Sequence, residues 1–304
     1  MKSLGDDINT VPVISLKNIV YVTTDDDCLY ALDLVDGRRR WKFEAEDVIT
    51  AGFTLSKDET MIFLAAGEGT IYALNIEGKT PKVQWKKKVN GAVQAPIVHD
   101  FLNKIIYLSA VNDEDAHSHG HDIYGINVVD GSTKFTFRVH EAIAFPFYIA
   151  DHILYVLTFN HGFLYEYDRI TGASRMPYKT GMAEPSDAFP AIDLGHKKMY
   201  FGLQAGGIGQ INLENRKLDF TDPLDGRRIL TAITLCSDKT NQELYFGTKD
   251  EIVKYDMGKR KLSWAVKFDS MPGAGAPVLD NTGSLLVRFD IKSILIVSMI
   301  IFVI

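Results

Sequence analysis

Short apolar runs alternate with polar turns along almost the whole chain. Residues 19–33, IVYVTTDDDCLYALD, show the pattern: an apolar and β-branched run, an aspartate-rich turn, and a second apolar run ending in Asp33. Runs rich in Val, Ile and Tyr and bounded by Asp, Asn and Gly are typical of β-strands joined by tight turns. Outside the apolar C-terminal tail, no stretch has a convincing helical period. The pattern therefore predicts an all-β protein.

The same unit returns along the chain at intervals of 42 to 48 residues, which indicates a repeat architecture. Each copy begins with a short apolar piece, continues through two central strands, and ends in a strand that carries Trp or another aromatic residue. A seventh opening piece, GAPVL at 275–279, begins a further copy. The first aromatic residues of the six full copies are Tyr21, Phe63, Tyr107, Tyr155, Tyr200 and Tyr245.

Four strands per copy, arranged radially, make the blades of a β-propeller. We predict an all-β propeller of four-stranded antiparallel blades, about seven in number, with the last one incomplete or atypical. Residues 1–290 would form this single domain. The apolar tail at 291–304 would be the outer strand of the last blade or a truncated membrane segment. An open ring and a truncated eight-bladed protein are alternatives.

An Asp or Asn follows the third strand of every complete copy, and a glycine comes soon after in five of the six. Such a side chain can accept a hydrogen bond from the backbone two residues on, and Gly tolerates positive φ. Because Asp and Asn replace each other freely here, we interpret these residues as turn formers rather than catalytic carboxylates. They are Asp33, Asn75, Asn127, Asp168, Asn212 and Asp256.

All three tryptophans stand at equivalent points of the predicted fourth strands. We expect them to pack one blade against the next, with Phe137, Tyr178 and Phe220 doing so in the copies that lack Trp. This structural role is predicted for Trp41, Trp85 and Trp264.

The pattern LYALDLVDGRRRW at 29–41, repeated more loosely at 71–85 and 252–264, resembles the pyrrolo-quinoline-quinone-like repeat of the quinoprotein-like propellers. The resemblance covers about residues 11–290. It implies either a quinone-dependent dehydrogenase or a scaffold that has lost the cofactor, a group that includes the outer-membrane barrel-assembly lipoprotein and stress-sensor luminal domains. The enzyme group typically has eight blades and holds its quinone between a Trp face and a disulfide of adjacent cysteines, with calcium nearby.

Here Cys28 and Cys236 are far apart in the sequence, and the repeat accounts for every Trp. We therefore expect two free thiols, no quinone and no catalytic residue. A quinone-dependent oxidoreductase stays as the first alternative to a non-catalytic scaffold.

The third copy contains eight more residues between its second-strand and third-strand aromatics than the first two copies do. The extra residues lie within NDEDAHSHGHD at 112–122. Clustered imidazoles and carboxylates could bind Zn²⁺, Ni²⁺ or Cu²⁺, which would make the protein a metal- or ligand-sensing module. A solvated hairpin tip and a pH response between 5 and 7 are the other interpretations. The candidate ligands are Asp115, His117, His119 and His121.

A net charge of −6 provides no basic surface for nucleic acid. In a four-stranded blade, the insertion lies on the same face as the connections between blades. These connections are charged and mainly acidic, so we expect the face to bind a protein or peptide partner, with a simply solvated rim as the alternative. No signal peptide is visible and the compartment stays open, although the resemblance allows an extracytoplasmic one. Membrane association is expected only through the tail. The predicted partner-binding residues are Glu46, Asp47, Glu141, Glu184, Asp187, Asp225, Arg227 and Asp269.

Overall fold

The computed structural model divides the chain into two compact units, which are described separately below. The first unit comprises Met1–Thr158 and Tyr165–Pro177, and the second comprises Phe159–Leu164 and Tyr178–Ile304. The structure describes residues 10, 12–49, 51–111, 120–143, 145–158, 162–175, 178–179, 188–237, 242–267, 278–279 and 285–286.

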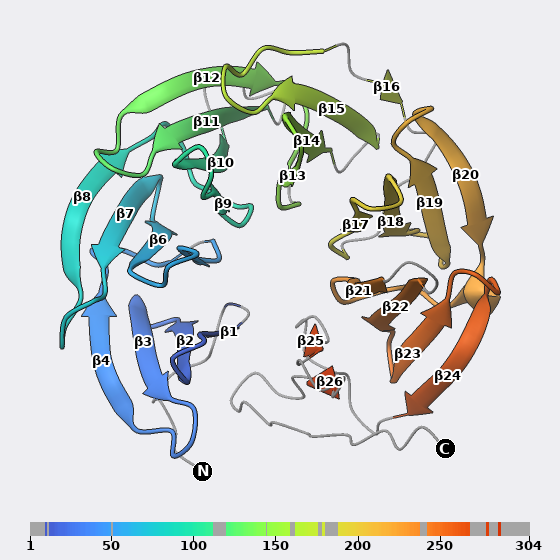
Figure 1. The fold of residues 1–304 in the computed structure, drawn as a ribbon, viewed down its shortest axis with the longest axis horizontal. Coiled ribbons are helices and arrows are strands. Elements are labelled where there is room, and N and C mark those ends of the chain that lie inside the picture. The colour runs from blue at the N-terminus through green and yellow to red at the C-terminus, as the bar shows by residue number, and fades with distance from the viewer. Residues whose placement is uncertain are drawn as a thin grey trace. The chain divides into compact units, whose positions relative to one another are not determined.

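The first unit contains three complete four-stranded antiparallel sheets in the simple order of the chain. Along these sheets β4, β8 and β12 lie at one edge, and β1 and β9 at the other (Figure 1). The strands are β1 (Val13–Ile14), β2 (Ile19–Thr24), β3 (Cys28–Asp33) and β4 (Arg39–Glu44); β5 (Thr54–Leu55), β6 (Met61–Ala66), β7 (Thr70–Asn75) and β8 (Lys82–Lys88); and β9 (Val98–Asp100), β10 (Ile105–Val111), β11 (His121–Asn127) and β12 (Thr133–Val139).

A fourth sheet has the order β13-β14-β15-β16, and the division between the two units falls within β15. Its strands are β13 (Tyr148–Ala150), β14 (Ile153–Leu157), β15 (Phe163–Asp168) and β16 (Tyr178–Lys179).

The second unit holds two further four-stranded antiparallel sheets and one short strand pair. Its elements are β17 (Ala191–Asp193), β18 (Lys198–Gly202), β19 (Ile208–Asn212) and β20 (Lys217–Asp222); the 3₁₀ turn η1 (Leu224–Gly226); β21 (Thr234–Ser237), β22 (Gln242–Gly247), β23 (Glu251–Asp256) and β24 (Lys261–Lys267); and β25 (Val278–Leu279) and β26 (Leu285–Leu286).

These sheets confirm the all-β prediction and the four-stranded antiparallel unit. Six complete sheets correspond to the six full copies in the sequence. The paired strands β25 and β26 fall in the seventh copy, where the sequence places a first and a second strand. The apolar tail at 291–304 lies outside the described residues. Within the described part of the chain, no helix is long and apolar enough to cross a membrane.

Neighbouring sheets bury their apolar faces against each other. One cluster joins the first two sheets and includes Tyr21 and Tyr72. A second joins the next pair through Phe63 and Tyr124, and Tyr107 lies in a third that reaches β13 and β14. In the second unit, a separate cluster joins the β17–β20 and β21–β24 sheets. The core is thus built between sheets, as the alternation of apolar and polar residues requires.

The fourth strand of each complete sheet other than β13–β16 has a register shift at the same place, and an aromatic residue directly follows the shift. Trp41 pairs with Ala31, Trp85 with Ala73 and Trp264 with Lys254. Phe220 takes this place in the fifth sheet, as predicted.

In the third sheet, Phe135 rather than Phe137 has the equivalent register position, opposite Gly125. Phe137 still packs against the next sheet, as predicted, because its ring stacks on that of Tyr167 in β15, with 3.8 Å between the ring centres. A Cβ on Gly125 would lie 2.4 Å from the tip of the Phe135 ring, so only glycine leaves room for the ring there. In the fourth sheet, Tyr178 pairs with Leu164, two positions away from the equivalent point on β15.

Trp85 packs against the next sheet of the first unit. Its indole Nε1 donates a hydrogen bond to the carbonyl of Val128, at 2.8 Å. A Cβ on Gly131 would lie 3.0 Å from the indole ring, so the β11–β12 turn fits directly against this side chain. Trp85 of the second sheet therefore contacts the last turn of the third sheet directly.

The Asp and Asn residues after the third strands form the expected turns. Five of them accept a hydrogen bond from the backbone N–H two residues on, at 2.9 to 3.1 Å, and Asp256 accepts one from the N–H of Lys259 at 2.9 Å. In five of the six copies, the residue four positions after the Asp or Asn has a positive φ. It is Gly37, Gly131 or Gly172 in three copies, and Arg216 or Arg260 in two others.

Candidate partner-binding face

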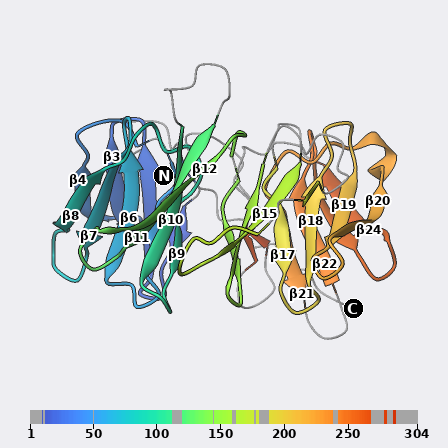
Figure 2. The same cartoon turned by 90° about the horizontal axis from the view of Figure 1, so that it is seen from above.

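Each four-stranded sheet has two ends, because successive turns of an antiparallel meander alternate between them. We call the end with the second-to-third-strand turns and the connections between sheets the connection face. The end with the first-to-second and third-to-fourth-strand turns is the turn face. In the first unit, the strands run between these two ends (Figure 2).

The predicted partner-binding residues divide into three groups. Glu46, Asp47 and Glu141 lie on connections of the first unit, between β4 and β5 and between β12 and β13. Asp225 and Arg227 lie on the β20–β21 connection of the second unit. Glu184, Asp187 and Asp269 fall outside the described residues.

Glu46 is an exposed carboxylate in a fixed position. Its side chain is 73% exposed, yet it forms an ion pair with Lys86 on β8. The Glu46 backbone N–H donates to the Tyr72 hydroxyl at 3.3 Å, and the Lys86 ammonium lies 5.4 Å from the centroid of the Tyr72 ring. The hydrogen bond from Lys86 to Glu46 also raises the pKa of Lys86. A cation over an aromatic face is stabilised by the quadrupole of the ring, so all three groups restrain one another.

The first sheet repeats this arrangement with a different carboxylate. Asp26, in the β2–β3 turn, accepts hydrogen bonds from the Tyr30 hydroxyl at 2.8 Å and from the Lys42 ammonium at 3.3 Å. The ammonium lies 5.5 Å from the centroid of the Tyr30 ring. Burial raises the pKa of Asp26, but the hydrogen bonds from Thr24, Tyr30 and Lys42 outweigh it and keep the pKa below its usual value.

Asp47 sits where the chain passes closely over the β6–β7 turn. Its Oδ1 accepts the N–H of Val48 at 2.8 Å, and a Cβ on Gly67 would lie within 2.3 Å of its Oδ2. Gly67 has a φ of 53° and donates its N–H to the carbonyl of Val48 at 2.7 Å. The absence of a side chain at Gly67 therefore makes room for this carboxylate.

In the third sheet, the Tyr124 hydroxyl accepts the N–H of Asn90 on the preceding connection, at 3.3 Å. Asp122 and Arg138 form an ion pair beside it, at 3.0 Å. These tyrosines were missed in the sequence, although a signal existed. Tyrosine stands three residues before the turn-forming Asp or Asn in each of the first four copies: Tyr30, Tyr72, Tyr124 and Tyr165.

In the second unit, Asp225 is the most exposed carboxylate on the connection, at 88% of its side chain. Arg227 pairs with it at 3.1 Å and with Glu251 on β23 at 2.8 Å. Its guanidinium also donates to the Leu224 carbonyl at 3.2 Å. Arg227 is thus held by β23 and the connection at once, and it fixes the position of the Asp225 carboxylate.

One interpretation of the sequence placed His121 at a solvated hairpin tip. The structure instead places it in a strand. It is the first residue of β11, pairs with Val111 and Val139, and is only 3% exposed. Burial lowers its pKa to about 4, against a partial opposing effect of Asp122. It is therefore neutral between pH 5 and 7, and the expected pH response does not apply to this histidine.

The other candidate metal ligands, Asp115, His117 and His119, lie outside the described residues. Within the residues that the structure does describe, no three His, Cys, Asp or Glu side chains are grouped as a metal site requires. Metal binding by the insertion stays a prediction.

The described residues do not fit the quinone site of the enzyme group. Cys28 and Cys236 are separate free thiols, the first buried in β3 and the second exposed in β21. Trp41, Trp85 and Trp264 lie 5.6 to 6.2 Å, ring centre to ring centre, from second-strand aromatics of their own sheets. Each tryptophan is thus part of the packing between strands.

Successive four-stranded antiparallel sheets, with an Asx turn after the third strand and an aromatic residue on the fourth, are typical of a β-propeller of pyrrolo-quinoline-quinone-like repeats. The family model described as "Outer membrane protein assembly factor BamB" matches residues 25–265. The chain belongs to this family.

A solved structure supports the fold assignment. The chain is similar to BamB from Moraxella catarrhalis, known from its crystal structure, with a TM-score of 0.66 and 15% sequence identity. The similarity covers 97% of this chain and 85% of that one. No curated protein matches the sequence at a significant level.

Proposed function

We propose that this chain is a non-catalytic propeller scaffold that binds a protein partner through its connection face, including the insertion at 112–122. The family name supports a role in the assembly of outer membrane proteins, and hence an extracytoplasmic location. In this proposal the chain supplies a rigid surface and no chemistry.

The observation that carries the proposal is the exposed but anchored carboxylate of Glu46. Ordering a free glutamate costs side-chain entropy when a partner binds. Here the ion pair with Lys86 restrains the side chain, and the hydrogen bond to the Tyr72 hydroxyl holds the Glu46 backbone N–H. A preorganised charge of this kind suits recognition, because it lowers the cost of association and steers the encounter.

Site-specific photo-cross-linking in the native organism tests this proposal. A photoreactive residue at Asp47 should give a discrete adduct with one partner. The same residue at Lys134, exposed on the outer strand β12, serves as the control and should give none. Adducts from neither position, or the same adducts from both, would contradict the proposal.

A charge reversal then tests the role of Glu46. The Glu46→Lys variant should weaken the Asp47 adduct several-fold, and the loss should depend on salt because exposed charges are screened. Lys134→Glu changes the charge by the same amount on the outer strand and should leave the adduct intact. Equal adduct yields from the two variants would show that the carboxylate does not take part.

A further inference from the structure

The turn face of the first unit differs from the connection face in character. Six of the nine exposed large apolar side chains described in this unit lie on its turns, while Val48 alone lies on a connection. Leu102 and Val35 are the most exposed after Leu16, at 69%, 86% and 88%. Single exposed apolar residues are ordinary, but a group on one face marks a contact surface. The six residues are Leu16, Val35, Phe101, Leu102, Val129 and Ile170.

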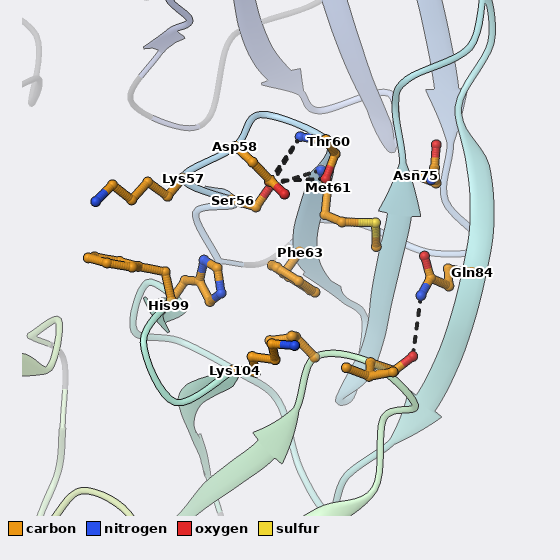
Figure 3. Close-up of a pocket in the computed structure, with 13 residues that line it drawn as sticks. Ser56, Lys57, Asp58, Thr60, Met61, Phe63, Asn75, Gln84, His99 and Lys104 are labelled. Carbon is orange, nitrogen blue, oxygen red and sulfur yellow. Dashed lines mark hydrogen bonds between the residues drawn. The ribbon is translucent and has the colours of Figure 1, made fainter.

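A pocket of about 670 Å³ opens on this face between the β5–β8 and β9–β12 sheets. Met61 and Phe63 of β6 and His99 of β9 point into it from opposite sides (Figure 3). Phe101 and Val129 belong to its lining and are exposed, so the pocket continues into the apolar surface around it. Its volume is within the range of about 300–1,000 Å³ in which proteins hold small ligands and side chains.

Two lysines border the pocket. The Lys57 ammonium lies 4.1 Å from the centroid of the Phe101 ring, and Lys104 lines the other side. Neither forms an ion pair with any residue that the structure describes. Among the described residues, the pocket therefore presents two cations without an acidic partner of their own.

The carboxylate in the pocket lining, Asp58, forms hydrogen bonds within its own turn. Asp58 accepts hydrogen bonds from the Ser56 hydroxyl at 2.5 Å and from the Thr60 hydroxyl at 3.0 Å. These bonds, that of Ser56 first, keep the pKa of Asp58 below its usual value. Burial lowers the pKa of His99, so the imidazole is neutral at pH 7. Two lysines face one carboxylate, and the pocket has a net positive charge.

We propose that this pocket binds a peptide segment of a partner protein, with an aromatic or large aliphatic side chain inserted against Met61 and Phe63 and a neighbouring carboxylate between Lys57 and Lys104. The apolar floor takes the side chain, and the two cations select the acid. A peptide fits better than a free acid because the exposed lining residues Phe101 and Val129, with Leu102 next to Phe101 in the chain, continue the apolar surface at the mouth of the pocket. The proposal goes beyond the connection-face function, because it places a second site at the other end of the sheets.

The methyl group of Met61 allows the site to be observed directly. The purified protein, labelled with ¹³C at its methionine methyls, is titrated with 3-phenylpropionate, which carries an aromatic ring and a carboxylate. The Met61 signal is assigned with Met61→Leu. It should shift saturably, while the signals of the methionines outside the pocket change little. The neutral isostere 3-phenylpropionamide should bind about fivefold more weakly, since it lacks the charge.

Paired variants test the two cations. Lys57→Gln/Lys104→Gln should weaken 3-phenylpropionate binding about fivefold and leave 3-phenylpropionamide binding unchanged. Lys79→Gln/Lys82→Gln removes the same charge from exposed positions at the β7–β8 turn and the start of β8, and it should change neither. No shift at Met61, or equal binding of acid and amide, would overturn the proposal.

A peptide arm decides the source of the ligand. Acetyl-Asp-Phe-Asp-amide should shift Met61 at lower concentration than 3-phenylpropionate does, and acetyl-Asn-Phe-Asn-amide at higher concentration than the acidic peptide. If the small acid binds and the acidic peptide does not, the site serves a free carboxylate and the peptide proposal is wrong. Failure of the cross-linking at Asp47 would not affect these titrations, so the two proposals fail separately.

Discussion

Two buried aspartates at equivalent points of the repeat should differ in what they contribute to stability. Asp100 ends β9 in the first unit, and Asp193 ends β17 in the second. They are 3% and 4% exposed, and each accepts hydrogen bonds within the turn that follows. Replacing either by Asn keeps the shape and removes the charge. The cost of that change depends on whether the partners can adapt.

The charged partner of Asp100, Arg169, cannot adapt. Its Oδ2 receives the Asn103 side-chain amide at 2.8 Å and the Tyr107 hydroxyl at 3.2 Å, and it pairs with Arg169 at 3.4 Å. The Tyr107 hydroxyl lies 2.6 Å from the Arg169 carbonyl and can donate its hydrogen bond there instead. The Arg169 guanidinium has only donors, so it cannot accept a hydrogen bond from the new Asn amide group. Removing one member of a buried ion pair costs 3–5 kcal/mol. Because Arg169 is 16% exposed, we expect about 3 kcal/mol for Asp100→Asn.

The partners of Asp193 are more adaptable. Its Oδ2 receives the Ser237 hydroxyl at 2.7 Å, His196 Nδ1 at 2.9 Å and the Gln242 amide at 3.1 Å. A hydroxyl can accept as well as donate, and a histidine can exchange tautomers. Asp193→Asn should therefore cost about 1 kcal/mol, the value of an ordinary hydrogen bond.

Urea unfolding at pH 7 measures how much free energy of unfolding Asp100→Asn and Asp193→Asn each lose relative to wild type. Equal losses, or a larger loss for Asp193→Asn, would refute the reasoning from adaptable partners. Burial raises the pKa of Asp193, but the hydrogen bonds from Ser237 and His196 hold it below its usual value. As the pH falls, the unfolded state binds a proton at Asp193 before the folded state does. The contribution of the Asp193 charge to the free energy of unfolding is therefore present above about pH 4 and is lost as the pH falls through the folded pKa. The difference in the free energy of unfolding between wild type and Asp193→Asn should become smaller below about pH 4.

Further changes test the contact between neighbouring sheets. Trp85→Ala should lower the free energy of unfolding by about 3 kcal/mol, and Trp85→Phe by about 1 kcal/mol because Val128 loses its donor; an unchanged thermal melt for Trp85→Ala would contradict the packing role. Gly37→Ala and Gly131→Ala both force alanine to positive φ, at 67° and 72°. A Cβ on Gly37 meets nothing within 4 Å, so its cost should be about 1 kcal/mol. Gly131→Ala also presses on Trp85 and should cost about 2 kcal/mol, and equal melting temperatures for the two alanine variants would count against the contact.

The period of the repeat made the sheets predictable from the sequence. It did not show which phenylalanine of β12 has the register position that tryptophan has in other copies. Phe135 and Phe137 are two apart and point to the same side of β12. The register shift at Gly125 decides between them, and a shift of pairing leaves no mark in apolar alternation. The glycine opposite Phe135 was the available signal, because the other copies have larger residues there.

The environment of His121 was wrongly predicted for a related reason. A histidine among polar residues suggests a loop, yet β10 and β11 of the third sheet extend to Val111 and His121. The neighbouring strands therefore enclose His121 even though its sequence context is hydrophilic. A polar sequence predicts exposure only where the residues do not pair with neighbouring strands. Strand pairing, in turn, depends on residues that are distant in the sequence.

The pocket could not be predicted, because its two sides come from different copies of the repeat. Lys57 lies in the β5–β6 turn, and Phe101 lies in the β9–β10 turn of the next sheet. The two residues meet only when the sheets pack together. Asx turns and third-strand tyrosines recur, so the fold accounts for them. Lys57 over Phe101 and Glu46 against Lys86 depend on side chains that the repeat does not require. In a chain built from copies, residues that the shared turns do not explain are the ones to test for binding.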